Sequence, residues 1–417
     1  MPPLEALLRA QRRRLVAHLA RDLGLAHLAL AEDAVQVASL RAVQAWAEAG
    51  PPDNPAGWLY RVARHHAIDQ LRHDARSQEL PTDEAAEPLA LVTLPPPGRL
   101  AGELDDEELA LLFAACHPRL PAPTQVALGL RALAGLPLAT IADGLFCTEA
   151  ALAQRLARAR QQLAGQALEL PAGDDLPARR ETVLTALLLM FHAGMSAAGR
   201  QGARDAPEAS PNDPLAMCWE AIRLTRALAA HPAAASAEAD AAAALLLLHG
   251  ARLTGRLDAN GDIVPLPGQP RDRWDQGLVR LGLAHLQRSQ RGTRLTRWHL
   301  LAGVAAEHAL APRYEATDWA AIVRYYDALL RLDGSAAPRL GHAVALAESG
   351  EPAQALSLLQ ALAADTPAVL QAHGHAAMAR AHRRLGQAGA ASEAMKQAIA
   401  CARHPADARM LQRQGQQ

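Results

Sequence analysis

The chain has 417 residues, of which 50% are hydrophobic and 3% aromatic. Its 42 basic and 43 acidic residues give a formal net charge of −1, so the charge of the whole chain gives no support for nucleic-acid binding, and a basic surface would have to be local. This length predicts two or three domains, and the abundance of alanine and leucine favours helices over a large sheet. We therefore expect an all-α protein.

The four cysteines, Cys116, Cys147, Cys218 and Cys401, are far apart and form no CxxC motif. Free thiols in a reducing cytoplasm are the simplest interpretation. The first residues are followed by no apolar signal-peptide region, and no uninterrupted apolar run approaches about 18 residues. We therefore expect a cytoplasmic protein that does not span a membrane.

Residues 1–76 predict a helical domain with helices over Leu4–Leu23, Leu30–Glu48 and Ala56–Arg76. The break between the last two helices, GPPDNP at Gly50–Pro55, ends in an asparagine and a proline, which are typical of a helix N-cap and first turn. The third helix has an apolar arc opposite a cationic stripe formed by Arg61, Arg64, His65, Arg72 and Arg76.

This cationic stripe, together with Trp58 and Tyr60, could hold a nucleic-acid backbone and stack an unpaired base. From this helix alone, a solvated charged face with Trp58 in the core is the simpler alternative. Residues 77–104 are acidic and rich in proline, which indicates a linker to a second module.

Residues 105–165 predict this second helical module, with helices over Asp105–Ala115 and Pro123–Leu133. The stretch Leu136–Leu163 then predicts two short helices joined by a tight turn, with Thr148 as the N-cap of the second. One side of that helix carries Leu152, Leu156, Ala159 and Leu163, and the other carries Ala150, Gln154, Arg158 and Gln161. This pattern is typical of a helix that enters the DNA major groove, although an ordinary helical hairpin shares it.

The C-terminal half predicts a helical extension over residues 166–318 and a repeat region over 319–417. LAESGEPAQAL (346–356) and LGQAGAASEAM (385–395) superpose at a spacing of 39 residues, and Ala321–Leu332 fits a helix of an earlier unit. Tetratricopeptide repeats recur at about 34 residues, so this pair would be slightly expanded. Stacked hairpins usually hold a peptide or partner on a concave surface, but such an array could also only pack against the other modules.

Taken together, these segments resemble the extracytoplasmic-function sigma factors of bacterial RNA polymerase. The resemblance rests on AEDAVQ (31–36), DNPAGWLYRVARHHAIDQLR (53–72), DDEELALLFAACHPRLPAPTQVALGLRALAGLPLATIADGLF (105–146) and TEAALAQRLARAR (148–160), in the family's order. Segments from residue 179 onward are similar to the C-terminal extension of one subgroup, which ends in a tetratricopeptide-like domain. The resemblance implies sigma region 2 at 1–76, a linker at 77–104 and a region 4 helix-turn-helix at 105–165.

The resemblance also implies function and site residues. The protein would recruit polymerase to promoters rather than catalyse a reaction, without a cofactor or metal, and its extension would control its activity and bind a regulatory protein or peptide. The largest and second-largest subunits of core RNA polymerase would be contacted by Asp33, Gln36 and Arg41. The −10 promoter element would be contacted by Asp53, Asn54, Trp58, Arg61, Arg64, His65, Arg72 and Arg76. The −35 element would be contacted by Thr148, Glu149, Ala150, Ala153, Gln154, Arg155 and Arg158.

The chain departs from the family pattern in three places. The pair His65-His66 replaces the more usual Arg-Asn. Val37 and Ser39 stand where the family usually has an acidic and an aromatic residue, which leaves the polymerase contact less certain. FHAGM (191–195) stands where the subgroup has an Asn-Glu-Gly-Tyr sequence, of which only Gly194 remains.

Two other functions stay open. A helix-turn-helix regulator that does not engage core polymerase would need the 148–160 helix but not the 31–75 block. A metal-dependent hydrolase would use histidines of the C-terminal half, but no HExxH or GxSxG motif accompanies them. Those histidines are His299, His308, His373 and His375.

Overall fold

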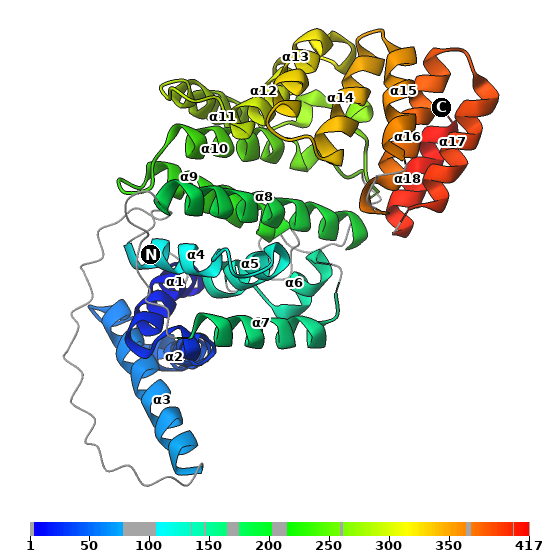
Figure 1. Cartoon of the computed structure of the whole chain (residues 1–417). Coiled ribbons are helices and arrows are strands. Elements are labelled where there is room, and N and C mark those ends of the chain that lie inside the picture. Colours follow the sequence, from blue (N-terminus) through cyan, green and yellow to red (C-terminus); the bar gives the residue numbers. More distant parts are fainter. Residues whose placement is uncertain are drawn as a thin grey trace. The chain divides into compact units, whose positions relative to one another are not determined.

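The structure is a computed structural model that describes residues 4–77, 106–134, 136–145, 147–164, 175–201, 215–258, 262–363, 368–402 and 404–416. These residues form helices α1–α18 and no named strand, and one isolated antiparallel bridge joins Leu257 and Ile263 (Figure 1). The prediction of an all-α fold is confirmed. The chain divides into two compact units, Met1–Met190 and Phe191–Gln417, with the division inside α8.

Unit 1 begins with three helices, α1 (Leu4–Leu23), α2 (Leu28–Ala49) and α3 (Pro55–Ser77). Each lies within two residues of its predicted range. Gly24 and Gly50 end α1 and α2 with φ values of 83° and 72°, a backbone conformation that favours glycine. The predicted inner face of α2 is buried, namely Val35, Ala38, Ala42 and Trp46. The predicted linker, apart from Ser77, lies outside the described residues.

The second module of unit 1 contains α4 (Asp106–Ala115), α5 (Ala122–Gly129), α6 (Leu138–Gly144) and α7 (Glu149–Leu163). The predicted helix over Pro123–Leu133 is α5 followed by a π-helical turn, η2 (Leu130–Ala134), so its second half is not a regular α-helix. Helix α4 and η2 pack against α1, and α7 packs against the short turn η1 (Leu25–His27). The two predicted modules therefore share one core.

Unit 2 is a succession of helices in which each contacts the next along the chain, from α9 to α18 (Figure 1). The most buried is α10, whose residues Ala241–Leu248 are all buried because α9, α11 and α12 pack around it. The helices are α9 (Leu215–Ala230), α10 (Ala237–Gly250), α11 (Gln276–Ser289), α12 (Arg297–Leu310), α13 (Trp319–Leu330), α14 (Ala336–Glu348), α15 (Pro352–Ala363), α16 (Ala368–Arg384), α17 (Ala388–Ala400) and α18 (Pro405–Gln416).

The repeat near the C-terminus has a different register from the predicted one. The turns before α15 and α17 contain Gly350 and Gly386, with φ values of 105° and 72°, and these glycines are 36 residues apart. Gly389, which the spacing of 39 aligned with Gly350, lies inside α17. Buried Ala355 and Ala391 follow the same 36-residue spacing. The predicted register was wrong because Gly386, and not Gly389, adopts the left-handed turn.

Gly194 is required by the close approach of α8 (Asp175–Gln201) to α9. A Cβ atom at this position would lie 2.7 Å from Cys218 Sγ, 2.9 Å from Met217 Cβ and 3.0 Å from the Cys218 backbone nitrogen. The glycine that remains from the altered 191–195 motif therefore has a packing role.

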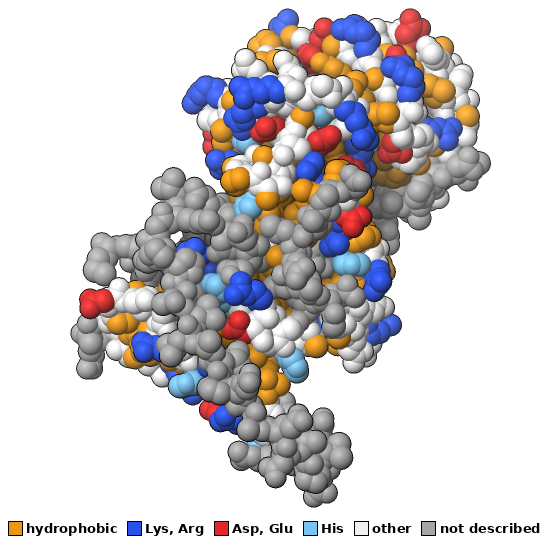
Figure 2. All heavy atoms as spheres, turned by 60° about the vertical axis from the view of Figure 1, so that its left-hand side comes forward, with side chains coloured by type: hydrophobic (Ala, Val, Ile, Leu, Met, Phe, Trp, Pro, Cys, Tyr) orange, Lys and Arg blue, Asp and Glu red, His pale blue; other side chains and the backbone are white. Residues whose placement is uncertain are grey.

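Two observations concern the prediction that the protein does not span a membrane: the distribution of charged side chains on its surface and the burial of helix α8. On the face seen in Figure 2, basic and acidic side chains of unit 2 are interspersed, in agreement with the formal net charge of −1. Among the described residues, Asp175–Ala198 in α8 is long and apolar enough to cross a membrane, but 56% of its most apolar stretch is buried, as in a core helix.

We expect Gly194→Ala to lower the free energy of unfolding by about 1–3 kcal/mol, because the added methyl group overlaps the backbone of α9. Gly374→Ala in α16 is the matched control, since a Cβ there meets no atom within 4 Å. That variant should be more stable than the parent by about 0.5–1 kcal/mol. Urea unfolding of the three full-length proteins gives the comparison, and equal stability of Gly194→Ala and the parent would refute the packing role.

Candidate nucleic-acid interface

The outer face of α2 carries the three predicted polymerase-binding residues. Asp33, Gln36 and Arg41 are all exposed, on the side opposite the buried core positions. Leu40 and Val43 lie on the same face, and 60% and 48% of these residues are exposed. The sequence analysis missed these two apolar residues, although their spacing from Asp33 and Gln36 is helical.

The two departures from the family pattern in α2 have simple local environments. Ser39 is half-buried, and its hydroxyl donates a hydrogen bond to the Val35 carbonyl at 2.8 Å. Val37 is also half-buried. Ser39 lies at the edge of the exposed face, whereas Val37 lies four residues from both Asp33 and Arg41 and so within it.

The loop before α3 is exposed and fixed at its end by a helix cap. Asn54 Oδ1 accepts a hydrogen bond from the Gly57 backbone nitrogen at 2.9 Å, which satisfies one of the free N–H groups of the first turn. Asp53 and Asn54 are both exposed. The tip of this loop is therefore open to a ligand, whereas its junction with α3 is rigid.

Trp58 is half-buried and packs on Trp46 of α2, with ring centroids 5.2 Å apart. The neighbouring Tyr60 is buried and donates a hydrogen bond from its hydroxyl to Asp22 of α1. Burial, the hydrogen bond and the charge of Asp22 all raise the Tyr60 pKa. Both aromatic residues thus tie α3 to α1 and α2.

The cationic stripe of α3 is exposed for most of its length. Arg61, His65 and Arg72 are exposed and Arg64 is half-buried. Arg76 lies in the last turn of α3, and its side chain is outside the described set. The apolar arc opposite the stripe includes buried Leu59, Ala63 and Ala67.

Helix α7 has the two faces that the sequence predicted. Thr148 is its N-cap, and its hydroxyl accepts a hydrogen bond from the Ala151 nitrogen at 3.2 Å. The residues packed inward are Leu152, Leu156, Ala159 and Leu163. Of the predicted −35 residues, Arg155 is half-buried and the others are exposed: Thr148, Glu149, Ala150, Ala153, Gln154 and Arg158.

The contact between the two modules is centred on Glu32, which points into the core of unit 1. Its side chain is 2% exposed, and Oε2 accepts hydrogen bonds from Arg131 Nε at 3.2 Å and Arg160 Nη2 at 3.3 Å. Arg131 belongs to η2 and Arg160 to α7. This ionic link joins α2 to the module that contains the predicted −35 helix. Sequence analysis gave no signal for it, because the partners are 99 and 128 residues away.

The Glu32 carboxylate is incompletely compensated. Its pKa is raised above the ordinary value of 4.5, because the desolvation caused by burial outweighs the attraction of Arg160, Arg131 and Arg12. Its second oxygen, Oε1, has no hydrogen-bond partner among the described residues. The link therefore specifies how the modules dock more than it stabilises the fold.

The predicted binding sets lie on three separate surfaces of unit 1: the outer face of α2, the 50–54 loop with α3, and the outer face of α7. The arrangement suits extended partners such as protein and DNA surfaces better than a small substrate.

The candidate metal ligands do not assemble into a site. No three His, Cys, Asp or Glu side chains of the described residues lie close enough together to hold a metal ion. Cys116 is buried, and desolvation raises the pKa of its thiol to about 12. The ring of His117 accepts a hydrogen bond from the backbone nitrogen of Arg119. His299 belongs to a helix cap with Thr296, and His308 packs edge-on against Trp319.

Comparison with known proteins adds a family assignment. Residues 8–77 match sigma-70 region 2, and residues 179–290 match a family of unknown function (DUF6596). The chain is 36% identical over 395 residues to "Uncharacterized protein R00370" of Rhizobium meliloti (strain 1021), an alignment that covers 93% of this chain and 90% of the relative. No solved structure matches it significantly.

The region 2 match spans α1–α3 and supports a sigma-70 family sigma factor, a non-enzymatic class of transcription factor. The chain belongs to the same family as the Rhizobium protein. A sigma-70 region 2 domain implies binding to core RNA polymerase and to promoter DNA.

We expect Glu32 to make the stability of the fold depend on pH. Between pH 4.5 and its raised pKa, the folded protein keeps a proton that the unfolded chain has lost, so this contribution to stability decreases as pH rises through that range. Glu32→Gln cannot titrate, and the parent should therefore lose stability relative to this variant as pH increases from 4.5. Urea unfolding of both proteins at several pH values measures the difference, and a constant difference would contradict the raised pKa.

Proposed function

We propose that this protein is an extracytoplasmic-function sigma factor that directs promoter-specific transcription initiation in the cytoplasm and is controlled by its own C-terminal helical unit. The observation that carries the proposal is the region 2 match over residues 8–77, on a helix α2 whose outer face is exposed. In this proposal the second module binds the −35 element, and unit 2 regulates activity.

Core polymerase binds the outer face of α2 in this proposal. Leu40 and Val43 provide apolar area, and Asp33, Gln36 and Arg41 surround it with polar and charged groups. Protein interfaces commonly combine a small apolar centre with a polar rim. The two exposed apolar residues fit this arrangement and partly offset the departures at Val37 and Ser39.

The −10 element binds the 50–54 loop and α3. Asp53 and Asn54 contact a base that has left the duplex stack, and extrusion of that base costs a few kcal/mol. Trp58 packs on Trp46, which favours a role in supporting the loop from behind. Arg61, Arg64, His65, Arg72 and Arg76 contact phosphates, which position the protein without reading sequence.

The −35 element binds the outer face of α7 as a duplex. Gln154 has the groups to pair with an adenine edge, and Arg158 those to pair with guanine or a phosphate. Ala150 and Ala153 occupy positions that could have carried longer polar side chains, so direct readout by this helix is modest. Sequence specificity is consequently shared with the −10 contacts.

The compact form of unit 1 is too small to span both promoter elements. The elements are centred about 25 base pairs apart, which is about 85 Å of duplex. A globular body of 190 residues has a radius of gyration of about 16 Å and thus a diameter of about 40 Å. The two modules must separate on the promoter, and this requires the Glu32 link to break.

Unit 2 acts as the regulatory extension. Its 36-residue spacing of turn glycines and its stacked hairpins support a tetratricopeptide-like array over 319–417. Such arrays usually bind a peptide or a protein, which here would be a regulatory partner.

We expect Leu40→Glu to weaken binding to core RNA polymerase by roughly tenfold, because it places a charge at the apolar centre of the α2 face. Leu295→Glu is a matched control, since Leu295 is also 60% exposed but lies in unit 2. Surface plasmon resonance with purified core enzyme measures binding, and run-off transcription then measures initiation. If the parent protein does not bind core polymerase, the sigma-factor proposal fails and the non-polymerase regulator is favoured.

We expect a chain that ends after Gln201 to differ from the full-length protein by roughly fivefold or more in run-off transcription, because removing unit 2 removes its coupling to the promoter-binding modules. The assay uses equal amounts of holoenzyme, with circular dichroism to verify that the truncated chain is folded. Equal transcription by both proteins would rule out control by the extension.

A further inference from the structure

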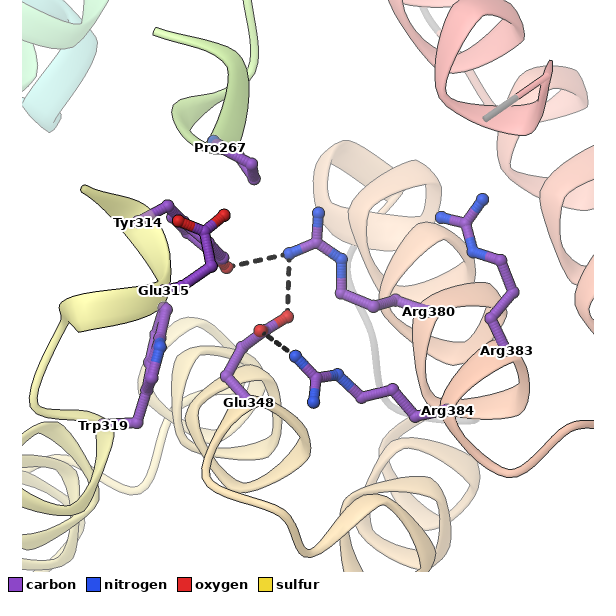
Figure 3. A pocket seen from close by; sticks show the side chains of 8 residues that line it. All are labelled: Pro267, Tyr314, Glu315, Trp319, Glu348, Arg380, Arg383 and Arg384. Carbon is purple, nitrogen blue, oxygen red and sulfur yellow. Dashed lines mark hydrogen bonds and ion pairs between the residues drawn. The ribbon is translucent and has the colours of Figure 1, made fainter. Parts of the chain in front are cut away.

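Unit 2 contains a groove beside α16 that the proposed promoter contacts do not use. Its central hollow, of about 650 Å³, is lined by Pro267, Tyr314, Glu315, Trp319, Glu348, Arg380, Arg383 and Arg384 (Figure 3). Two smaller hollows of about 300 and 240 Å³ adjoin it, and all three share Pro267 and Arg380. We call these three hollows the arginine groove.

The floor of the arginine groove is a buried glutamate between two arginines. Glu348, with a side chain only 3% exposed, accepts hydrogen bonds from Arg380 at 2.9 Å and from Arg384 (Figure 3). Arg380 also donates to the Tyr314 hydroxyl at 2.9 Å. One carboxylate thus serves two guanidinium groups, and Glu315 is the other carboxylate that lines the hollow.

The third arginine, Arg383, leaves the lining of the hollow with more guanidinium groups than carboxylates. Arg383 donates to the backbone carbonyl of Gln414 at 2.8 Å, an uncharged partner. Burial and the neighbouring Arg380 lower the pKa of Arg383. Among the described residues, only one nitrogen of each of the three guanidinium groups has a hydrogen-bond partner, namely Nη1 of Arg380, Nη1 of Arg383 and Nη2 of Arg384. The remaining N–H groups are suited to oxyanions, which arginine binds in a bidentate manner.

The two flanking hollows are more apolar than the centre. One is lined by side chains of α12, α13 and α14, including Val304, Ile322 and Val344. The other lies between the 263–268 segment and α18, and includes Ile263, Val264 and Met410. An extended peptide presents every second side chain to the same side, so a cationic centre between two apolar hollows matches a chain whose alternate residues are apolar, acidic and apolar in that order.

The 263–268 segment that closes one side of the groove is held to α18 by ion pairs. Asp262 accepts hydrogen bonds from Arg409 at 2.9 Å and from Arg413 at 2.7 Å. Arg409 and Arg413 are ion-paired with a carboxylate, whereas Arg383 has only an uncharged backbone partner. The groove therefore has a defined wall and a cationic centre that retains unused donors.

We propose that the arginine groove binds an acidic peptide in an extended conformation, with its carboxylates on Arg383 and Arg384 and apolar side chains in the flanking hollows. Arg380 positions Glu348 and Tyr314 beneath the peptide. A role for this peptide in controlling transcription rests on the proposed sigma-factor function, whereas peptide binding itself does not.

Fluorescence anisotropy with the full-length protein tests the proposal. The probe is a labelled, acetylated eight-residue peptide whose alternate residues are leucine, glutamate, glutamate and leucine, with serine between them, and its partner probe has glutamine in place of glutamate. The acidic probe should bind, and its affinity should decrease with added salt, as expected for charge pairing. The glutamine probe should bind at least about tenfold more weakly, equivalent to the loss of one strong charged contact.

The variant Arg383→Glu/Arg384→Glu should lower affinity for the acidic probe by at least about tenfold. Arg294→Glu, at an exposed arginine in the turn before α12, should bind like the parent, and circular dichroism verifies that both variants are folded. Equal binding of both probes, no binding of the acidic probe at millimolar concentration, or an unchanged double variant would each overturn the proposal. So would displacement of the bound probe by inorganic pyrophosphate at micromolar concentration, which would assign the groove to small phosphorylated anions. No polymerase is present in these measurements, so their failure is separable from failure of the sigma-factor proposal.

Discussion

The architecture of unit 1 depends on one buried carboxylate. Glu32 lies on α2, within the region 2 segment, and its partners Arg131 and Arg160 belong to the second module. A buried ion pair adds little net stability, but removing one partner leaves an uncompensated charge, and this penalty selects one docking geometry. The core side of α2, which includes Val35 and Ala42, lies opposite Leu40 and Asp33, and Glu32 lies between these two sides, so Leu40 and Asp33 face outward.

The same constraint separates the functional surfaces. Helix α7 contributes Arg160 to the link and buries Leu156 and Leu163, so its residues Gln154 and Arg158 lie on the outer face. The compact form therefore exposes the predicted contacts for polymerase and for both promoter elements, but holds the two modules closer together than the proposed promoter contacts require. The Glu32 link has one oxygen without a hydrogen-bond partner among the described residues, and the pKa of the glutamate is raised. Opening this link therefore costs less free energy than separating a fully satisfied ion pair, which suits modules that have to move apart.

Local patterns in the sequence predicted most of the helices and their buried faces. The apolar face of α2, the Asn54 and Thr148 caps and the inner face of α7 all follow from residues within a few positions of one another. The Glu32 link could not be predicted in this way, since charge pairing between distant residues leaves no local pattern. The predicted register of the repeat was wrong for a different reason. Two glycines, Gly386 and Gly389, fitted the sequence pattern, and only the backbone conformation distinguishes them.

Trp58 shows a limit of inference from residue type. An aromatic residue beside a cationic stripe suits base stacking and core packing equally well, and only its 5.2 Å contact with Trp46 favours the supporting role. Leu40 and Val43 show the opposite case, because their exposure on α2 became evident only when the buried side of the helix was known.

The two units place similar charges in different surroundings. Glu32 and Glu348 are each almost completely buried between two arginines, but Arg131 and Arg160 are 20% and 16% exposed, whereas Arg380 and Arg384 are 28% and 41% exposed. The less exposed pair serves as a link within unit 1. The more exposed pair retains N–H donors that face a groove, so an incoming carboxylate can bind them while Glu348 keeps its own hydrogen bonds.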